Sequence, residues 1–140
     1  MWNDEPENPA AEASAGPPTV VLLVEDEPLL RELTATMIDE AGFTALEANT
    51  ADDALALLEA RSDIALLFTD IDMPGSMDGL ELARLACERW PAIKTLVASG
   101  KVRPSASELP PNSVFLAKPY RGAALIAQLR SMAGRIDAKP

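Results

Sequence analysis

The fold is decided by residues 64–80, which read Ile-Ala-Leu-Leu-Phe-Thr-Asp-Ile-Asp-Met-Pro-Gly-Ser-Met-Asp-Gly-Leu. Residues 64–68 form a continuous apolar run, which is typical of a parallel strand buried on both faces. The run ends close to Asp70, Met73-Pro74-Gly75 predicts a turn, and a helix is expected from about Asp78. Asp70 therefore lies where a buried strand meets solvent, and in an open parallel sheet ligands bind at that edge.

The same alternation of apolar strand and periodic helix continues on both sides of this stretch. Strands are expected at residues 19–24, 43–48, 93–98 and 113–117, and helices at about 28–41, 51–60, 78–90 and 121–135. In the first helix Leu30, Leu33, Met37 and Ala41 form one apolar stripe, as expected of a surface that faces the core. Regular alternation predicts a doubly wound α/β domain with a parallel sheet.

The connection between the fourth and fifth strands is less regular. Residues 102–112 contain Pro104, Pro110 and Pro111. Because proline removes a backbone donor and interrupts a helix, any helix here is short, about Ser105 to Leu109. The domain is therefore expected to have a shortened or degraded fourth helix.

Three regions are expected along the chain. Residues 1–18 hold four acidic residues, four prolines and no cation, and a segment of this composition is expected to be a disordered tail. Residues 19–134 are expected to form the folded domain. Residues 135–140 are expected to be a frayed C-terminus.

Composition excludes several classes of function. The net charge of −10 argues against nucleic-acid binding, which needs cationic groups facing phosphates. No apolar run approaches the roughly 20 residues of a membrane span, and no signal peptide is evident. The single cysteine, Cys87, fits a reducing cytoplasm. The absence of histidine excludes Ser-His and Cys-His catalysis and imidazole metal sites.

Polar residues of different kinds stand at the ends of four predicted strands. Glu25 and Asp26 follow the first strand, Asp70 the third, Ser99 the fourth and Lys118 the fifth. Right-handed crossovers place all these ends at one edge of the sheet. The edge therefore gathers three acids, a hydroxyl and a cation.

These residue types together favour phosphoryl transfer. Two carboxylates about 4 Å apart repel each other by roughly 4 kcal/mol at an effective dielectric constant near 20, so either one of them is protonated or a cation neutralises them. Oxygen ligands without histidine or cysteine favour Mg²⁺, which leaves positions open for phosphate oxygens. In this chemistry Asp70 attacks as nucleophile, Lys118 screens the phosphate charge, and Ser99 donates to a phosphoryl oxygen.

Four motifs in order carry a resemblance to a known family. They are Val-Glu-Asp-Glu-Pro at 24–28, Thr-Asp-Ile-Asp-Met-Pro with Asp-Gly-Leu at 69–80, Ala-Ser-Gly at 98–100 and Lys-Pro-Tyr at 118–120. Over about residues 19–134 the sequence resembles a response-regulator receiver domain of two-component signalling. The resemblance implies a flavodoxin-like five-stranded sheet with strand order 2-1-3-4-5.

The resemblance also implies a role for each acid at the strand ends. Asp70 would be the phosphoacceptor and a ligand of the metal. Asp26 would bind Mg²⁺ directly, Glu25 would bind it through water, and the backbone carbonyl of Asp72 would be a further ligand. Mn²⁺ is the alternative ion.

The remaining roles concern phosphate binding and signalling. Lys118 would be the phosphate-binding lysine, and its bond to Pro119 would be cis. Ser99 would be the switch hydroxyl, and Phe115 falls where the family places its aromatic switch. A pre-existing two-state equilibrium would then shift on phosphorylation.

The expected function is that of a cytoplasmic, single-domain response regulator. It would accept phosphate from a sensor histidine kinase or a histidine phosphotransfer protein. It would act on a downstream protein target by docking, by relaying phosphate or as a phosphate sink. It would catalyse only its own phosphorylation and dephosphorylation, and would otherwise not be an enzyme. Neither nucleic acid nor a membrane is expected as a partner, and a homodimer through the first or last helix stays open.

Two other classes of function compete with this reading. Asp70-Ile71-Asp72 after an apolar strand is similar to the nucleophile motif of haloacid-dehalogenase-type phosphatases, although Pro74 departs from that motif. A pseudo-receiver would bind partners without phosphate. One further hypothesis concerns the mouth of the site, where Asp72 and Lys101 are expected to form an ion pair that slows water attack on the phosphorylated aspartate.

Overall fold

The computed structural model describes residues 17–137. Residues 1–16 of the expected tail and residues 138–140 of the expected C-terminus lie outside the described part. In chain order the elements are β1 (Val20–Val24), α2 (Pro28–Glu40), β2 (Thr44–Ala48), α3 (Ala51–Ala60), β3 (Ile64–Asp70), α4 (Gly79–Arg89), β4 (Lys94–Ser99), β5 (Ser113–Ala117) and α5 (Gly122–Asp137). The last helix therefore extends two residues beyond its expected end at 135.

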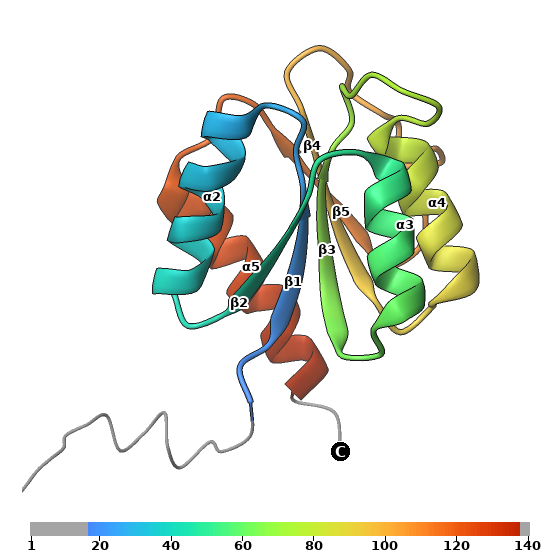
Figure 1. Cartoon of the computed structure of the whole chain (residues 1–140). Helices are drawn as coiled ribbons and strands as arrows, with labels where there is room; N and C mark the ends of the chain where they lie inside the picture. The colour runs from blue at the N-terminus through green and yellow to red at the C-terminus, as the bar shows by residue number, and fades with distance from the viewer. Residues whose placement is uncertain (1–16, 138–140) are drawn as a thin grey trace, which may run out of the picture.

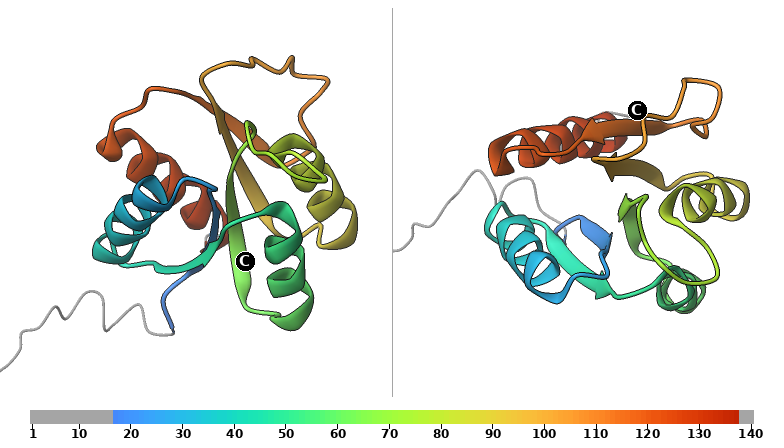
Figure 2. Two further views of the ribbon diagram at one scale, coloured as in Figure 1. Left: turned by 45° about the horizontal axis from the view of Figure 1, so that its top comes forward. Right: turned by 90° about the horizontal axis from the view of Figure 1, so that it is seen from above.

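The five strands form one parallel sheet with the order β2-β1-β3-β4-β5. This is the flavodoxin-like order that the sequence implied, so the predicted fold class is confirmed. Helices α2 and α5 cover one face of the sheet, and α3 and α4 cover the other (Figures 1 and 2). Because all strands are parallel, their carboxyl ends meet at a single edge.

Strand β1 shows why its sequence is apolar at every position. Val20, Leu22 and Val24 pack in the cluster under α3 and α4, whereas Val21 and Leu23 pack in the cluster under α2 and α5. Alternate side chains of a strand point to opposite faces, and here both faces are covered by helices. All five residues are buried. The central strands are thus held rigidly between two apolar layers.

The predicted core stripe of α2 is wrong at Leu30 and Leu33, whereas Met37 does pack against the core. Leu30 and Leu33 are 37% and 62% exposed, while Thr34, Ala35 and Ile38 are buried. The buried stripe is offset by one residue, which is about 100° around a helix with 3.6 residues per turn. Two of the three buried side chains are small, which lets α2 lie close to the sheet. The longer leucines are left at the rim.

The segment between β4 and β5 contains no helix among its described residues, which run without a gap from 100 to 112. It forms an open loop (Figure 2) with one turn in which the N–H of Glu108 donates to the carbonyl of Ser105 at 2.9 Å, and a second turn at residues 111–112 leads into β5. The Arg84 side chain of α4 donates to the carbonyl of Glu108 and anchors the loop. The expected degradation of the fourth helix is therefore complete, and β5 is only half-buried along its length.

The helices within residues 17–137 are too short or too polar to cross a membrane. None of the described helices combines the length and the apolar composition that a membrane span requires.

Candidate functional site

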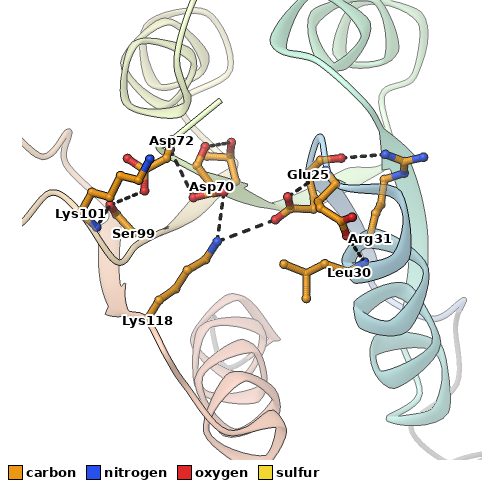
Figure 3. Close-up of polar contacts among 10 residues, drawn as sticks. Glu25, Leu30, Arg31, Asp70, Asp72, Ser99, Lys101 and Lys118 are labelled. Atoms are coloured by element: carbon orange, nitrogen blue, oxygen red, sulfur yellow. Dashed lines mark hydrogen bonds and ion pairs between the residues drawn. The ribbon is translucent and has the colours of Figure 1, made fainter. Parts of the chain in front are cut away.

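The carboxyl edge of the sheet brings the predicted site residues together. Glu25 and Asp26 follow β1, Asp70 ends β3, Ser99 ends β4, and Lys118 follows β5. Figure 3 shows the side chains of Glu25, Asp70, Ser99 and Lys118 close together at this edge of the sheet, which we call the mouth of the site. The buried strands β1, β3 and β4 fix where the acids and Ser99 begin, and the half-buried β5 positions Lys118.

Asp70 is held by a cation and by the backbone. Its side chain lies beside Lys118, whose Nζ is 3.0 Å from Asp70 Oδ2 and 3.9 Å from an oxygen of Glu25. The other oxygen of Asp70 accepts the backbone N–H of Asp72 at 3.2 Å. Asp70 is 7% exposed, so the charged contact to Lys118 is little screened by solvent. This carboxylate is fixed in position at the base of the mouth.

The charged form of the Glu25 carboxyl is disfavoured by its surroundings. It is 6% exposed, and burial raises the pKa of its carboxyl above the ordinary value, with the neighbouring Asp70 and Asp26 acting in the same direction. A hydrogen bond from the N–H of Glu27, at 3.0 Å, and the charge of Lys118 act to lower this pKa. The net direction is upward, chiefly because burial disfavours the charged form of the Glu25 carboxyl.

The acids at this edge fit a hard divalent cation. One carboxylate oxygen from each of Glu25, Asp26 and Asp70 lies within 4.8 Å of the others. Oxygen-only donor sets are those that Mg²⁺ and Ca²⁺ prefer, and Mg²⁺ uses few carboxylates and keeps several waters. The closeness of the three carboxylate oxygens is the observation that favours a cation here, since a positive ion relieves the repulsion between them.

Ser99 makes a contact that sequence reasoning missed. Its hydroxyl donates to Oδ2 of Asp72 at 2.7 Å and accepts the N–H groups of Lys101 at 3.1 Å and Val102 at 2.9 Å. The hypothesised ion pair between Asp72 and Lys101 is not formed, because no ion pair among the described side chains includes Lys101. The sequence did hold a signal for the contact between Ser99 and Asp72, because Asp72 follows β3 and Ser99 ends the neighbouring strand β4 at the same edge of the sheet.

Phe115 and Pro119 lie on the β5 side of the site. Phe115 is half-buried in β5 opposite Val97, and the guanidinium of Arg103 lies 5.9 Å from the centre of its ring. The peptide bond from Lys118 to Pro119 is cis, as the resemblance implied. Phe115 therefore packs against the cluster that includes Ala83 of α4, and Arg103 from the loop between β4 and β5 lies over its ring.

Gly79 has a structural role that the sequence motif did not explain. A Cβ atom at this position would lie 2.0 Å from the carbonyl oxygen of Asp70. The N–H of Gly79 also donates to the carbonyl of Ile71 at 3.1 Å. Only glycine lets the start of α4 approach the end of β3 so closely. This approach fixes the backbone on either side of Asp70.

An apolar groove runs beside the site between α2 and the loop after β5. It is lined by Leu30, Leu33 and Met37 from α2 and by Pro119 and Tyr120 from the loop, with Lys118 shared between groove and site. The Tyr120 ring meets Phe68 edge-on, with centres 6.1 Å apart. Burial, with the nearby Glu25 and Asp70 charges, raises the pKa of Tyr120 to about 12, so its hydroxyl stays protonated at neutral pH.

Comparison with known proteins gives one consistent family. The model of the response regulator receiver domain matches residues 21–130. The response regulator receiver protein CpdR of Brucella abortus is 31% identical over 116 residues, which cover 80% of this chain and 94% of CpdR. The nitrogen assimilation regulatory protein NtrX of Azorhizobium caulinodans is 38% identical over 81 residues, which cover 57% of this chain and 18% of NtrX. The chain thus matches less than a fifth of the length of that relative.

Solved structures agree with the sequence relatives. A response regulator receiver protein from Sinorhizobium medicae has a TM-score of 0.76 and 28% identity, covering 84% of this chain and 95% of that one. The receiver domain of the hybrid histidine kinase CckA has a TM-score of 0.70 and 28% identity, covering 81% and 97%. Family model, relatives and fold point the same way, and the chain belongs to the response regulator receiver domain family.

Proposed function

We propose that this receiver domain accepts a phosphoryl group on the carboxylate of Asp70 from a sensor histidine kinase or a histidine phosphotransfer protein. The observation that carries the proposal is the 3.0 Å contact between Lys118 Nζ and Asp70 Oδ2 beside the acids Glu25 and Asp26. A buried carboxylate next to a cation can attack phosphorus while the cation binds the phosphoryl oxygens.

The transfer is a displacement at phosphorus. An oxygen of Asp70 forms a bond to phosphorus as the bond to the imidazole nitrogen of the donor breaks, and that nitrogen keeps the electron pair. In dephosphorylation a water attacks phosphorus, inorganic phosphate leaves, and the Asp70 carboxylate is restored. The protein thus acts on its own phosphoryl group and turns over no separate substrate.

Four residues of this chain would hold the metal. Asp26 and Asp70 would bind Mg²⁺, or Mn²⁺, directly, Glu25 would bind it through water, and the carbonyl of Asp72 would be a further ligand. When bound, the ion neutralises charge that develops on the phosphoryl oxygens. Lys118 supplies a second positive charge, with its Nζ between the carboxylates of Asp70 and Glu25 (Figure 3).

Signalling would follow from Ser99 and Phe115. After transfer the Ser99 hydroxyl donates to a phosphoryl oxygen, and Phe115 moves toward the space that Ser99 leaves. The burial of Ser99 at the end of β4 and the half-burial of Phe115 in the neighbouring strand support this assignment. The surface of β4, β5 and α5 would then present the changed state to a downstream protein.

The phosphoryl donor would contact the apolar groove beside the site. The exposed Leu30 and Leu33 lie in this groove, and Lys118 lines both the groove and the phosphorylation site. A protein seated here would have its histidine next to Asp70. Apolar side chains exposed next to a reactive carboxylate are better explained by a protein donor than by a small molecule.

The competing functions have less support. Membership in the receiver family counts against a phosphatase of the haloacid-dehalogenase type, and the Asp72 carboxylate that such an enzyme would use as its second acid accepts a hydrogen bond from Ser99. A phosphate-independent binding module would retain the fold without accepting phosphate. Relay, docking and phosphate storage all require Asp70 to be phosphorylated first.

The proposal is tested by incubating the protein with Mg²⁺ and acetyl phosphate and recording its intact mass. We expect the wild type to gain one phosphoryl group that hydroxylamine removes. Asp70→Asn is expected to gain none, whereas Asp53→Asn, which changes an exposed acid on α3, is expected to gain it normally. No gain with either acetyl phosphate or a phosphohistidine protein would favour the phosphate-independent module.

A further inference from the structure

The hydroxyl of Ser99 has its hydrogen-bonding capacity fully used. It donates to Oδ2 of Asp72 at 2.7 Å and accepts from the N–H groups of Lys101 and Val102 (Figure 3). A serine hydroxyl has one proton to donate and two lone pairs with which to accept. Ser99 therefore has no proton available for a phosphoryl oxygen on Asp70 while its bond to Asp72 persists.

The bond between Ser99 and Asp72 is costly to replace. A hydroxyl that donates to a carboxylate makes a charge-assisted hydrogen bond, roughly twice as strong as a neutral one. Ser99 is 2% exposed, so water does not readily take the place of Asp72 as its acceptor. An equally good acceptor, such as a phosphoryl oxygen, is needed to draw the hydroxyl away.

We propose that Asp72 is a positioning residue that holds the Ser99 hydroxyl in a resting position and so opposes the phosphorylated conformation. The inference rests on the proposed phosphorylation of Asp70. No covalent bond changes in this step: the proton of Ser99 exchanges one anionic acceptor, Asp72, for another, the phosphoryl group. Asp72 and the phosphoryl group compete for one donor, so Asp72 sets how far phosphorylation shifts the equilibrium.

When Ser99 changes its acceptor, the loop between β4 and β5 (residues 100–112) is also affected. The N–H groups of Lys101 and Val102 lose their acceptor when Ser99 moves, and these residues begin the loop between β4 and β5. One residue further on, Arg103 lies over the ring of Phe115. Release of Ser99 from Asp72 therefore frees the backbone next to the residue that covers Phe115.

The test compares binding of beryllofluoride with Mg²⁺, a phosphoryl mimic, in four proteins: wild type, Asp72→Ala, Ser99→Ala and the double variant. Affinities are measured by NMR titration. We expect Asp72→Ala to gain about tenfold more affinity when Ser99 is present than when it is alanine, the factor that one charged hydrogen bond is worth. Removal of the Asp72 charge acts equally in both backgrounds, so the ratio of the two gains isolates the hydrogen bond.

Asp72→Asn is the matched variant, because its amide oxygen still accepts from Ser99 but carries no charge. The affinity of Asp72→Asn for beryllofluoride is expected to lie between that of the wild type and that of Asp72→Ala. Equal gains with and without Ser99 would overturn the role of Asp72 while leaving the proposed function of Asp70 intact. Failure of the wild type to bind beryllofluoride would instead count against the proposed function itself.

Amide hydrogen exchange gives a second test that needs no variant. Addition of beryllofluoride and Mg²⁺ to the wild type is expected to speed exchange at Lys101 and Val102, because their acceptor moves away. Unchanged exchange at both amides, with the mimic bound, would show that Ser99 does not leave its resting position and would overturn the inference.

Discussion

At the scale of single residues, Lys118 and Glu25 contribute opposite charges to the pocket around Asp70. Lys118 supplies positive charge 3.0 Å from Asp70. Glu25 adds negative charge that burial makes expensive, as its raised pKa shows. A pocket with this balance is poised to take up a cation and then an anionic phosphoryl group.

Lys118→Ala is expected to slow phosphorylation by acetyl phosphate by about tenfold or more, since one charged hydrogen bond is lost. The rate is measured as the gain of phosphoryl mass with time at saturating Mg²⁺. Lys101→Ala is the matched control, because this exposed lysine lies at the same mouth but forms none of the ion pairs among the described side chains. Equal rates in the two variants would contradict the role of Lys118.

Glu25→Gln is expected to raise the Tm of the metal-free protein at neutral pH. The pKa of Glu25 is raised by folding, so its contribution to stability is present below its ordinary value of 4.5 and is lost as pH rises through the folded pKa. Glutamine stays uncharged and avoids that loss. Melting curves in EDTA test this: the gain is expected at neutral pH and should vanish below pH 4.5. A lower Tm for the variant at neutral pH would contradict the account.

At the scale of elements, the close contact of α4 with β3 sets the backbone around Asp70. Gly79→Ala would place a methyl group 2.0 Å from the Asp70 carbonyl oxygen, so the two elements would have to separate. We expect a lower Tm and slower phosphorylation together. Gly134→Ala in α5, where nothing lies within 4 Å, is the control and is expected to be neutral or stabilising by up to about 1 kcal/mol. Similar effects in both variants would contradict this prediction.

Helix α2 offers a second test at this scale, because its buried stripe differs from the one expected from the sequence. Ile38→Ala is expected to lower the free energy of unfolding by about 2–5 kcal/mol, as for other truncations of buried side chains. Leu33→Ala, on the exposed stripe, is expected to change it by only about 0.5 kcal/mol. Urea denaturation measures both. A larger loss for Leu33→Ala would show that the sequence-based stripe was right.

At the scale of the whole molecule, the sheet order and the convergence of strand ends could be predicted, since both depend on strong local patterns. Continuous apolar runs marked β1 and β3, and every predicted site residue except Phe115 lies within two residues of the end of a strand. The rotation of α2 could not be predicted, because apolar stripes one residue apart are both plausible until packing chooses the smaller side chains. The partner of Asp72 depends on a loop conformation that no periodicity encodes.

The same limits explain why the loop between β4 and β5 was only partly predicted. Its prolines indicated a weakened helix, but the anchoring of Glu108 by Arg84 joins residues 24 positions apart. Contacts of this kind arise from the assembled fold. They leave β5 half-buried and the region of Phe115 open on the side where a helix is missing.

The most direct test of the central claim is to locate the phosphoryl group. Borohydride reduction of the protein after treatment with acetyl phosphate and Mg²⁺ converts an aspartyl phosphate to homoserine, and tandem mass spectrometry then identifies the position. The account predicts homoserine at residue 70 alone. Homoserine at residue 26 or 72, or at no position in a protein that has gained phosphoryl mass, would contradict it.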